Sequence, residues 1–463
     1  MDTPNFFISF LIYWLLLCAS CYLTGRQQSR RALAVAIPCG FVAALALAFP
    51  IFQPWQRLWF GSVGLLFTIK ASVLLLQPIE ELRKFSTVGL LIYMSAWPGM
   101  DPLPFAGREK CVEDGRRFVQ GYICFWIGLI LLVVSSFCPL PASGWLGLVA
   151  LLFTIHLGYA SMLTCSLRLL GWNVQPLFDA PLLSISLQDF WSRRWNRAFV
   201  EMDKLLFLPI LRRWLKPRSA IFAIFAISGL LHEAAISYPS GQLWGLPLLY
   251  FLIQGFGLLM EKQLSITKKL PTPLARAITL AWIIAPISLL FNDPFRAAFI
   301  EPLSLAVHQV VAHQTSSQLL STALWLAAIG HFCTLMAGLQ VPFRLHWKEE
   351  LKRLSNFNRK IMLNYAAYVG LMIIAFGWLT FALHDELMIG EKAAMYLAAV
   401  IAIFWILRLL VDRFYFSDTD WPKGPEFVIG HALLNTLFIA LASVYSYVVL
   451  TNWLWLPLLR LKT

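Results

Sequence analysis

FVQGYICFWIGLILLVVSSF occupies residues 118–137 and contains no charged side chain. An α-helix rises about 1.5 Å per residue, so about 20 apolar residues cross the roughly 30 Å hydrocarbon core of a bilayer. A run of this length and composition therefore predicts a membrane-spanning helix at 118–137.

Apolar runs of similar length recur along the whole chain. They lie near 6–24, 32–51, 58–76, 144–170, 219–239, 244–260, 274–291, 318–341, 361–383, 393–411 and 429–453. Of the 463 residues, 59% are hydrophobic and only 13% are charged, whereas soluble domains carry about 25% charged residues. We therefore predict an all-α polytopic membrane protein with about twelve transmembrane helices and exclude soluble, disordered and disulfide-stapled classes.

The net charge of +13 has to be interpreted loop by loop in such a protein. Lys and Arg gather in alternate loops, at 25–31, 108–117, 193–218, 262–276 and 344–360. Because basic loops favour the cytoplasmic side, we predict that the long segment 172–218 is cytoplasmic. The charge is thus a topology signal, and nucleic acid is not an expected partner. The apolar stretch 86–98 is too short to span and is predicted to be re-entrant or interfacial.

One composition break divides the chain. The segment from Arg344 to Lys360 is rich in charges of both signs, so we predict a main bundle at 1–343 and a three-span C-terminal region of unknown role at 344–463. Within the bundle, Lys70 lies in the apolar run LLFTIKASVLLL. An ammonium at that position is costly in a membrane unless it finds a partner, so Lys70 is structural or functional.

The stretch IFAIFAISGLLHEAAISYPS, residues 221–240, places His232 and Glu233 inside an apolar helix. An ionisable residue there costs at least about 2.5–3.5 kcal/mol on insertion, which makes it a functional candidate. Ser228 and Gly229 lie one turn earlier on the same helix face and permit a close approach by a backbone or a substrate. A lone histidine in an apolar helix is, however, more often a satisfied structural residue, and by position His331 is another such histidine.

A second stretch, SLQDFWSRRWNRAFV at 186–200, alternates aromatic side chains with arginines. This pattern is typical of an amphipathic helix at the headgroup level, whose arginines face lipid phosphates. The functional alternative is that the basic surface receives an anionic group, and that Asn196 points towards the reacting atoms.

The two stretches together resemble the wax synthase branch of the membrane-bound O-acyltransferase superfamily, since SLQDFWSRRWN is followed by SGLLHE in an apolar helix. The resemblance covers roughly residues 1–340 and implies a polytopic helical bundle over 1–343. It also implies that Asn196 and His232 are the catalytic pair. The residues around the pair are expected to bind the substrates: Trp191, Arg193, Arg194, Trp195, Ser228 and Glu233.

The implied activity is transfer of an acyl group from acyl-CoA, or another acyl thioester, to a long-chain alcohol, which gives a wax ester. A neutral histidine can remove the hydroxyl proton as the oxygen attacks the thioester carbonyl, so no covalent enzyme intermediate is required. Asn196 could donate a hydrogen bond to the developing oxyanion. The expected partners are therefore acyl-CoA, the alcohol and membrane lipids.

No cofactor or metal is expected besides acyl-CoA as a co-substrate. The sequence contains neither GxxxxGK[ST] nor GxGxxG, and no metal-ligand spacing stands out. Two alternatives stay open. The acceptor could be another lipid hydroxyl, such as that of diacylglycerol or a sterol, or the chain could be a secondary transporter, although no internal repeat is evident.

Overall fold

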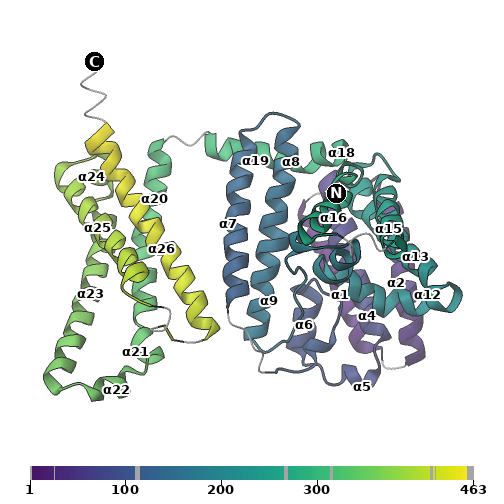
Figure 1. Cartoon of the computed structure of the whole chain (residues 1–463), viewed down its shortest axis with the longest axis horizontal. Helices are drawn as coiled ribbons and strands as arrows, with labels where there is room; N and C mark the ends of the chain where they lie inside the picture. Colours follow the sequence, from purple (N-terminus) through teal and green to yellow (C-terminus); the bar gives the residue numbers. More distant parts are fainter. Residues whose placement is uncertain are drawn as a thin grey trace. The chain divides into compact units, whose positions relative to one another are not determined.

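The computed structural model describes residues 3–24, 27–109, 115–264, 270–312, 316–417, 421–422 and 424–455 (Figure 1). These residues form helices and connecting loops, and no β-strand occurs among them. Eleven of the described helices are long and apolar enough to cross a membrane. The chain is therefore an integral multi-pass membrane protein of the all-α class, as the sequence predicts.

The predicted span at 244–260 is present as the helix α15 (Leu246–Leu264) but is not one of these eleven. Gln254 lies in the middle of α15, and Glu261 and Lys262 lie in its last turns. These polar residues lower its hydropathy below that of the other spans.

Two compact units make up the chain. Unit 1 consists of Met1–Glu113 and Gln120–His308, and unit 2 consists of Asp114–Val119 and Gln309–Thr463. The composition break at Arg344 lies inside unit 2, so the structural division comes earlier in the chain than the compositional one. A separate role for 344–463 stays a prediction.

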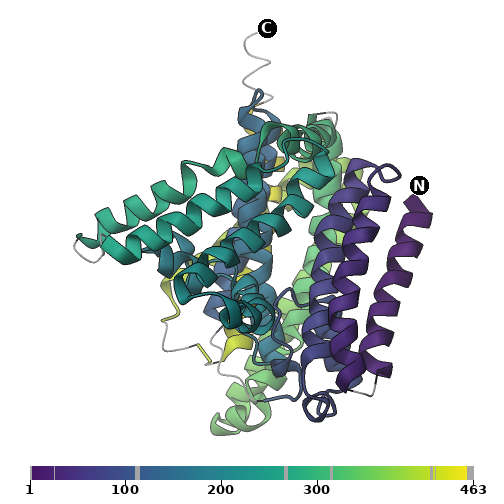
Figure 2. The same cartoon turned by 90° about the vertical axis from the view of Figure 1, so that its right-hand side faces the viewer.

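Unit 1 begins with a group of five apolar helical elements, and the last of them, α4, is the most buried. They are α1 (Thr3–Leu23), α2 (Gln27–Ala48), α3 (Pro54–Trp59), the π-helical turn η1 (Phe60–Gly64) and α4 (Leu65–Leu76). Figure 2 shows the purple helices of this group side by side, and α4 packs against both α1 and α2. Every residue from 68 to 75 is buried, including the polar Thr68, Lys70 and Ser72.

Lys70 of α4 is fully buried and has partners. Its Nζ donates hydrogen bonds to the carbonyl oxygens of Trp97, at 2.8 Å, and Gly99, at 2.7 Å. The same Nζ lies 3.7 Å from the ring centroid of Tyr93. Lys70 therefore fixes the loop 97–99 against α4, which offsets the cost of its burial.

The short apolar stretch predicted at 86–98 forms α6 (Thr87–Ser95), which follows α5 (Ile79–Leu82). α6 has nine residues and begins where the Ser86 hydroxyl accepts a hydrogen bond from the Gly89 N–H, at 3.0 Å. A helix of this length does not cross a membrane, in agreement with the prediction. Tyr93 and Met94 of α6 lie in the core of unit 1.

Small residues let the next helices of unit 1 approach closely. The helices are α7 (Arg116–Ser136), α8 (Ala142–Leu151), the π-helical η3 (Leu152–Tyr159) and α9 (Ala160–Leu169). A Cβ added to Gly121 would lie 2.8 Å from the Gly158 carbonyl oxygen, and one added to Gly128 would lie 2.5 Å from the Thr154 nitrogen. Such small-residue contacts are typical of helices packed within membranes.

The remaining elements of unit 1 surround the candidate site. They include η4 (Pro181–Leu183), α10 (Leu187–Asp189), η5 (Phe190–Arg194), α11 (Arg197–Met202), η6 (Asp203–Phe207), α12 (Leu208–Trp214), α13 (Pro217–His232), η7 (Glu233–Ser237), α14 (Tyr238–Ser240), α16 (Thr272–Ile284), α17 (Ile287–Leu290), α18 (Asp293–Phe295), η9 (Arg296–Ile300) and α19 (Glu301–Ala312). In Figure 2 the teal helices of this part lie at a steep angle to the purple N-terminal helices. A Cβ on Gly229 of α13 would lie 2.8 Å from Leu248 of α15, so the small residue predicted to permit a close approach admits α15.

Unit 2 is a second helical core. It contains α20 (Ser316–Gly338), α21 (Val341–Arg344), α22 (Trp347–Glu350), η10 (Leu351–Arg353), α23 (Asn356–Ala382), α24 (His384–Ile389), α25 (Lys392–Phe414), α26 (Pro425–Val449) and η11 (Leu450–Trp455). The buried faces of α20, α23, α25 and α26 form one apolar cluster. His331 of α20 lies within this core and is fully buried.

Candidate functional site

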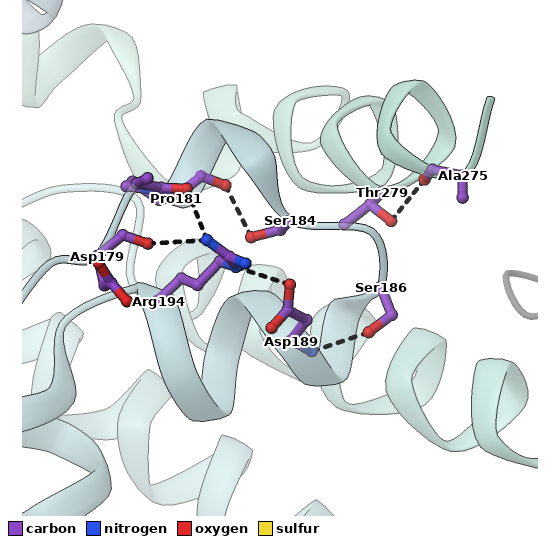
Figure 3. A network of polar contacts seen from close by, with 9 residues as sticks. Asp179, Pro181, Ser184, Ser186, Asp189, Arg194, Ala275 and Thr279 are labelled. Carbon is purple, nitrogen blue, oxygen red and sulfur yellow. Dashed lines mark hydrogen bonds and ion pairs between the residues drawn. The ribbon is translucent and has the colours of Figure 1, made fainter. Parts of the chain in front are cut away.

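The polar loop before the site is organised by Arg194 (Figure 3). Its Nε donates to the Asp189 carboxylate at 2.7 Å, and its Nη1 donates to the carbonyl oxygens of Asp179, at 3.2 Å, and Ala180, at 3.4 Å. The Asp179 N–H donates in turn to the Arg194 carbonyl oxygen at 2.9 Å. Ser186 caps this turn, because its hydroxyl accepts from the Asp189 N–H. Arg194 therefore holds the loop in shape, with its guanidinium occupied inside the chain.

Asn196 follows this loop in a left-handed backbone conformation, with φ at 38° and ψ at 66°. Non-glycine residues adopt this conformation rarely, and asparagine is among those that tolerate it best. The Trp195 N–H donates to the Phe190 carbonyl oxygen and the Arg197 N–H to that of Leu177, which fixes the backbone on both sides. The left-handed backbone at position 196 thus favours asparagine, independently of any role of its side-chain amide.

His232 is the last residue of α13, and its ring packs against two aromatic rings. Its centroid lies 5.3 Å from that of Phe199 of α11 and 4.3 Å from that of Phe251 of α15. Its Nδ1 lies 2.7 Å from the Ser228 carbonyl oxygen. Because a carbonyl only accepts, Nδ1 carries the proton, and Nε2 of the neutral ring has a free lone pair. A histidine in this tautomer is suited to remove a proton.

A cavity of about 270 Å³ lies between η5, α11, η6, α13 and α15. Its walls contain Gln188, Trp191, Ser192, Trp195, Asn196, Phe199, Val200, Asp203, Lys204, Leu208, Ile221, Ile224, Phe225, Ser228, His232, Phe251, Leu258 and Lys262. Asn196 and His232, which belong to separate sequence motifs, therefore share one cavity. Most of the wall is apolar, as a lipid-soluble substrate requires.

Among the residues expected to bind substrates, Trp191, Trp195 and Ser228 line the cavity with the pair. Ser228 takes part through its backbone carbonyl, which orients His232. The Trp191 indole N–H is buried and has no hydrogen-bond partner among the described residues. An indole N–H only donates, so its partner would have to be an acceptor atom.

Trp195 is fixed by stacking on both of its faces. Its ring lies 5.3 Å from Phe190 at an interplanar angle of 13°, and 6.2 Å from His156 at 10°. His156 thus contributes a packing contact behind the cavity wall. This stack gives the loop before Asn196 a rigid support.

Arg193, Arg194 and Glu233 are not part of the cavity wall. Arg193 is exposed, whereas Arg194 is occupied by the loop. Glu233 is buried, and its Oε1 accepts hydrogen bonds from the N–H groups of Gly245 and Leu248, both at 3.0 Å. Glu233 therefore caps the start of α15, where unpaired N–H groups favour a carboxylate.

Sequence reasoning missed Asp203, Lys204 and Lys262, which also line the cavity. Asp203 lies four residues after Phe199, which places the two side chains on one helix face. That spacing is the signal that could have found it. Burial raises the pKa of the Asp203 carboxyl to about 7. Lys204 and Lys262 are exposed and place positive charge at the mouth of the cavity.

No three His, Cys, Asp or Glu side chains of the described residues gather closely enough to hold a metal ion. The site is thus built from one histidine, one asparagine, one carboxyl group and aromatic walls. It defines an integral membrane protein with a histidine–asparagine cavity at the end of a spanning helix.

Residues 174–253, which carry this cavity's two motifs, match the Membrane bound O-acyl transferase family. Over 169 residues the chain is 27% identical to the long-chain-alcohol O-fatty-acyltransferase of Simmondsia chinensis, which covers 34% of this chain and 48% of the relative. It is 31% identical over 189 residues to probable long-chain-alcohol O-fatty-acyltransferase 2 of Arabidopsis thaliana, covering 35% and 54%.

A third similarity concerns another acceptor. The chain is 31% identical over 137 residues to acyl-CoA–sterol O-acyltransferase 1 of Arabidopsis thaliana, covering 27% of this chain and 39% of that relative. The chain spans about half or less of the length of the relatives it matches. These matches confirm the predicted resemblance to the wax synthase branch of the membrane-bound O-acyltransferases.

Proposed function

We propose that this protein is a membrane-embedded O-acyltransferase that esterifies a long-chain alcohol with the acyl group of acyl-CoA, or of another acyl thioester, to give a wax ester. The observation that carries the proposal is the shared cavity of Asn196 and His232, in which the Nε2 lone pair of His232 is free. The matches over 174–253 support the same reaction.

In this proposal His232 acts as the general base. Its Nε2 takes the hydroxyl proton as the alcohol oxygen attacks the thioester carbonyl, and the Ser228 carbonyl holds the ring in the required tautomer. Phe199 and Phe251 restrict the ring to one orientation, which lowers the entropic cost of the reactive geometry.

Charge develops on the carbonyl oxygen during the attack, and donors already in place stabilise it most effectively. We assign this task to the Asn196 amide and to the Trp191 indole N–H, which line the same cavity. A hydrogen bond from a buried donor to the thioester would also satisfy the Trp191 N–H, which is otherwise costly to bury.

The two substrates have different polarity and are expected to enter from different directions. The exposed Lys204 and Lys262 at the mouth attract the anionic carrier of the acyl group. An acyl chain and a lipid-soluble alcohol favour the apolar wall formed by Ile221, Ile224 and Phe225. No cofactor is proposed, because acyl-CoA acts as a co-substrate.

Another lipid hydroxyl is the second candidate acceptor. The similarity to acyl-CoA–sterol O-acyltransferase 1 favours a sterol as the alternative to a linear alcohol. Diacylglycerol has the same reactive group, and the acceptor is set by the shape of the apolar wall, since the chemistry at His232 is identical.

Expression of the chain in a host without its own neutral-lipid synthesis tests this proposal. The host is fed a labelled fatty acid together with a long-chain alcohol, a sterol or neither, and the lipid extract is analysed for new esters. We expect a wax ester with the alcohol, and none from a matched His232→Ala strain with equal protein in its membranes. An ester formed only with the sterol would show that the acceptor is a sterol and not a long-chain alcohol. No new ester with any acceptor would contradict the acyltransferase proposal.

A further inference from the structure

Asp203 is a titratable group in the cavity to which the reaction above gives no task. Its side chain lines the same walls as Asn196 and His232. Its Oδ1 is buried and has no hydrogen-bond partner among the described residues. A buried, unpaired carboxyl oxygen costs stability, so its retention in a substrate cavity needs an explanation.

The chain order of Asn196, Phe199 and Asp203 arranges the groups of the site. Phe199 of α11 and Asp203 at the start of η6 are four residues, or about 6 Å, apart along the helix, and Asn196 is the N-cap residue that precedes α11. The Phe199 ring lies against the His232 ring, at 5.3 Å between centroids. The residue that contacts the His232 ring thus lies between Asn196 and Asp203 in the chain, and all four line the cavity.

Asp203 also lies on the side from which the acyl carrier enters. Its chain neighbour Lys204 and Lys262 of α15 supply the exposed positive charge of the cavity mouth. A thioester bound with its carrier at the mouth has its sulfur between the carbonyl carbon and these lysines. We expect the sulfur on the side of the cavity where Lys204 and its chain neighbour Asp203 lie.

We propose that Asp203 is a second proton-transfer residue, which protonates the sulfur atom that leaves the acyl thioester. This inference rests on the proposed function, because it requires a thioester donor. Asp203 is then the general acid of the site, and His232 is its general base.

The proposed step balances in atoms and charge. The alcohol oxygen forms a bond to the carbonyl carbon and loses its proton to Nε2 of His232. The carbon–sulfur bond breaks, its electron pair stays on sulfur, and sulfur takes the proton of Asp203. The resulting imidazolium and carboxylate attract each other in the cavity, and the proton returns from His232 to Asp203. Overall, the alcohol proton ends on the free thiol.

The surroundings of Asp203 favour the protonated form of its carboxyl group. Burial raises its pKa from the ordinary range of an aspartate to about 7. The other titratable groups of the cavity wall are Lys204 on its own element, His232 of α13 and Lys262 of α15, and the adjoining α12 carries Arg212 and Arg213. An acid with a pKa close to the working pH is the most efficient proton donor.

The test is the pH dependence of turnover in Asp203→Asn. Because the acid form is required, wild-type kcat is expected to fall as the pH rises above about 7. In Asp203→Asn, kcat with acyl-CoA should drop by about 100-fold, and the remaining activity should lack this alkaline fall. Asp203→Glu, which keeps the carboxyl group, should restore part of the rate and the alkaline fall. Glu80→Gln, an exposed site on α5, serves as the matched control and should behave as the wild type.

Each outcome decides the proposal. An Asp203→Asn protein with wild-type kcat, or with a raised KM and unchanged kcat, would assign Asp203 to packing or binding and overturn the proton transfer. If Asp203→Asn does not accumulate, the wild-type profile decides, since a kcat that stays constant between about pH 7 and 9 excludes a required acid of this kind. A wild-type protein without transferase activity would overturn the proposed function. If the wild type and Glu80→Gln are both active, a change seen in Asp203→Asn is due to the loss of the Asp203 carboxyl group.

Discussion

His232 in unit 1 and His331 in unit 2 both lie inside apolar helices, yet their surroundings differ. His232 lines a cavity, and its Nδ1 bonds a backbone carbonyl, which leaves Nε2 free. His331 is fully buried among the rings of Trp405 and Tyr445, and its Nε2 lies 3.1 Å from the Tyr445 hydroxyl. A membrane histidine that lines a cavity and keeps one ring nitrogen unpaired is thus available for chemistry, whereas a histidine whose nitrogen contacts a neighbouring side chain has a structural role.

The largest expected effect is that of His232→Ala. Without the base, turnover of acyl-CoA and a long-chain alcohol should fall by about 10²–10⁴-fold, because nothing else at that position accepts the proton. Initial rates of ester formation by purified protein measure it. His331→Ala is the matched control, and its folded fraction should turn over at the wild-type rate. A folded His232→Ala protein with more than about a tenth of wild-type turnover would show that the base is not His232.

Asn196→Gly separates the two reasons for an asparagine at this position. Glycine accepts the left-handed backbone of Asn196 without strain but removes the amide. If the amide stabilises the oxyanion, kcat should fall by about 100-fold while the thermal stability stays close to that of the wild type. Asn196→Ala should lose stability as well. Wild-type kcat in Asn196→Gly would mean that asparagine is needed only for its backbone conformation.

The two neighbouring arginines are expected to respond differently, since only Arg194 is tied into the loop. Arg194→Ala should lower the free energy of unfolding by about 1–3 kcal/mol, and Asp189→Ala should do the same. Arg193→Ala should leave stability unchanged and raise the KM for acyl-CoA several-fold at low salt, with a smaller difference from the wild type at high salt. Thermal unfolding and steady-state kinetics distinguish these cases. Equal kinetic defects in both arginine variants without loss of stability would contradict the structural role of Arg194.

The smallest effect on turnover is expected for His331→Leu. The variant removes the bond to Tyr445, whose hydroxyl keeps its contact with the Thr380 hydroxyl at 2.5 Å. Interhelical hydrogen bonds of this kind contribute about 0.6 kcal/mol on average, so the unfolding midpoint should move only slightly. If this variant lost activity while unit 1 stayed folded, His331 of unit 2 would be needed for turnover. That result would contradict the purely structural role of His331.

Much of the fold follows from the sequence because apolar length is a strong physical constraint. Membrane helices must satisfy their backbone internally, so a run such as 118–137 can form little else. The exception is α15, because Gln254 and the charged residues at the end of the helix lower its mean hydropathy, from which membrane spans are predicted. The pair Asn196 and His232 was found by the motif resemblance, which does not by itself state that the residues share a cavity.

The remaining site residues depend on tertiary contacts that spacing does not reveal. Glu233 looks like a partner of His232 in the chain, but it caps α15 through Gly245 and Leu248. Arg194 looks like a free cation, but its partner Asp189 comes within reach only because η5 winds as a π-helical turn. Asp203 stands outside both motifs, and its position in the cavity follows from the direction in which α11 leaves the loop.

The central claim is that acyl transfer takes place in the cavity between α11, α13 and α15. An acyl-CoA with a photoreactive diazirine beside the thioester carbonyl tests it directly, when it is crosslinked to the purified protein and the labelled peptides are mapped. We expect labels within 188–208 and 221–232, which excess unmodified acyl-CoA suppresses. Labels confined to unit 2, or labels in the cavity that acyl-CoA does not suppress, would contradict it.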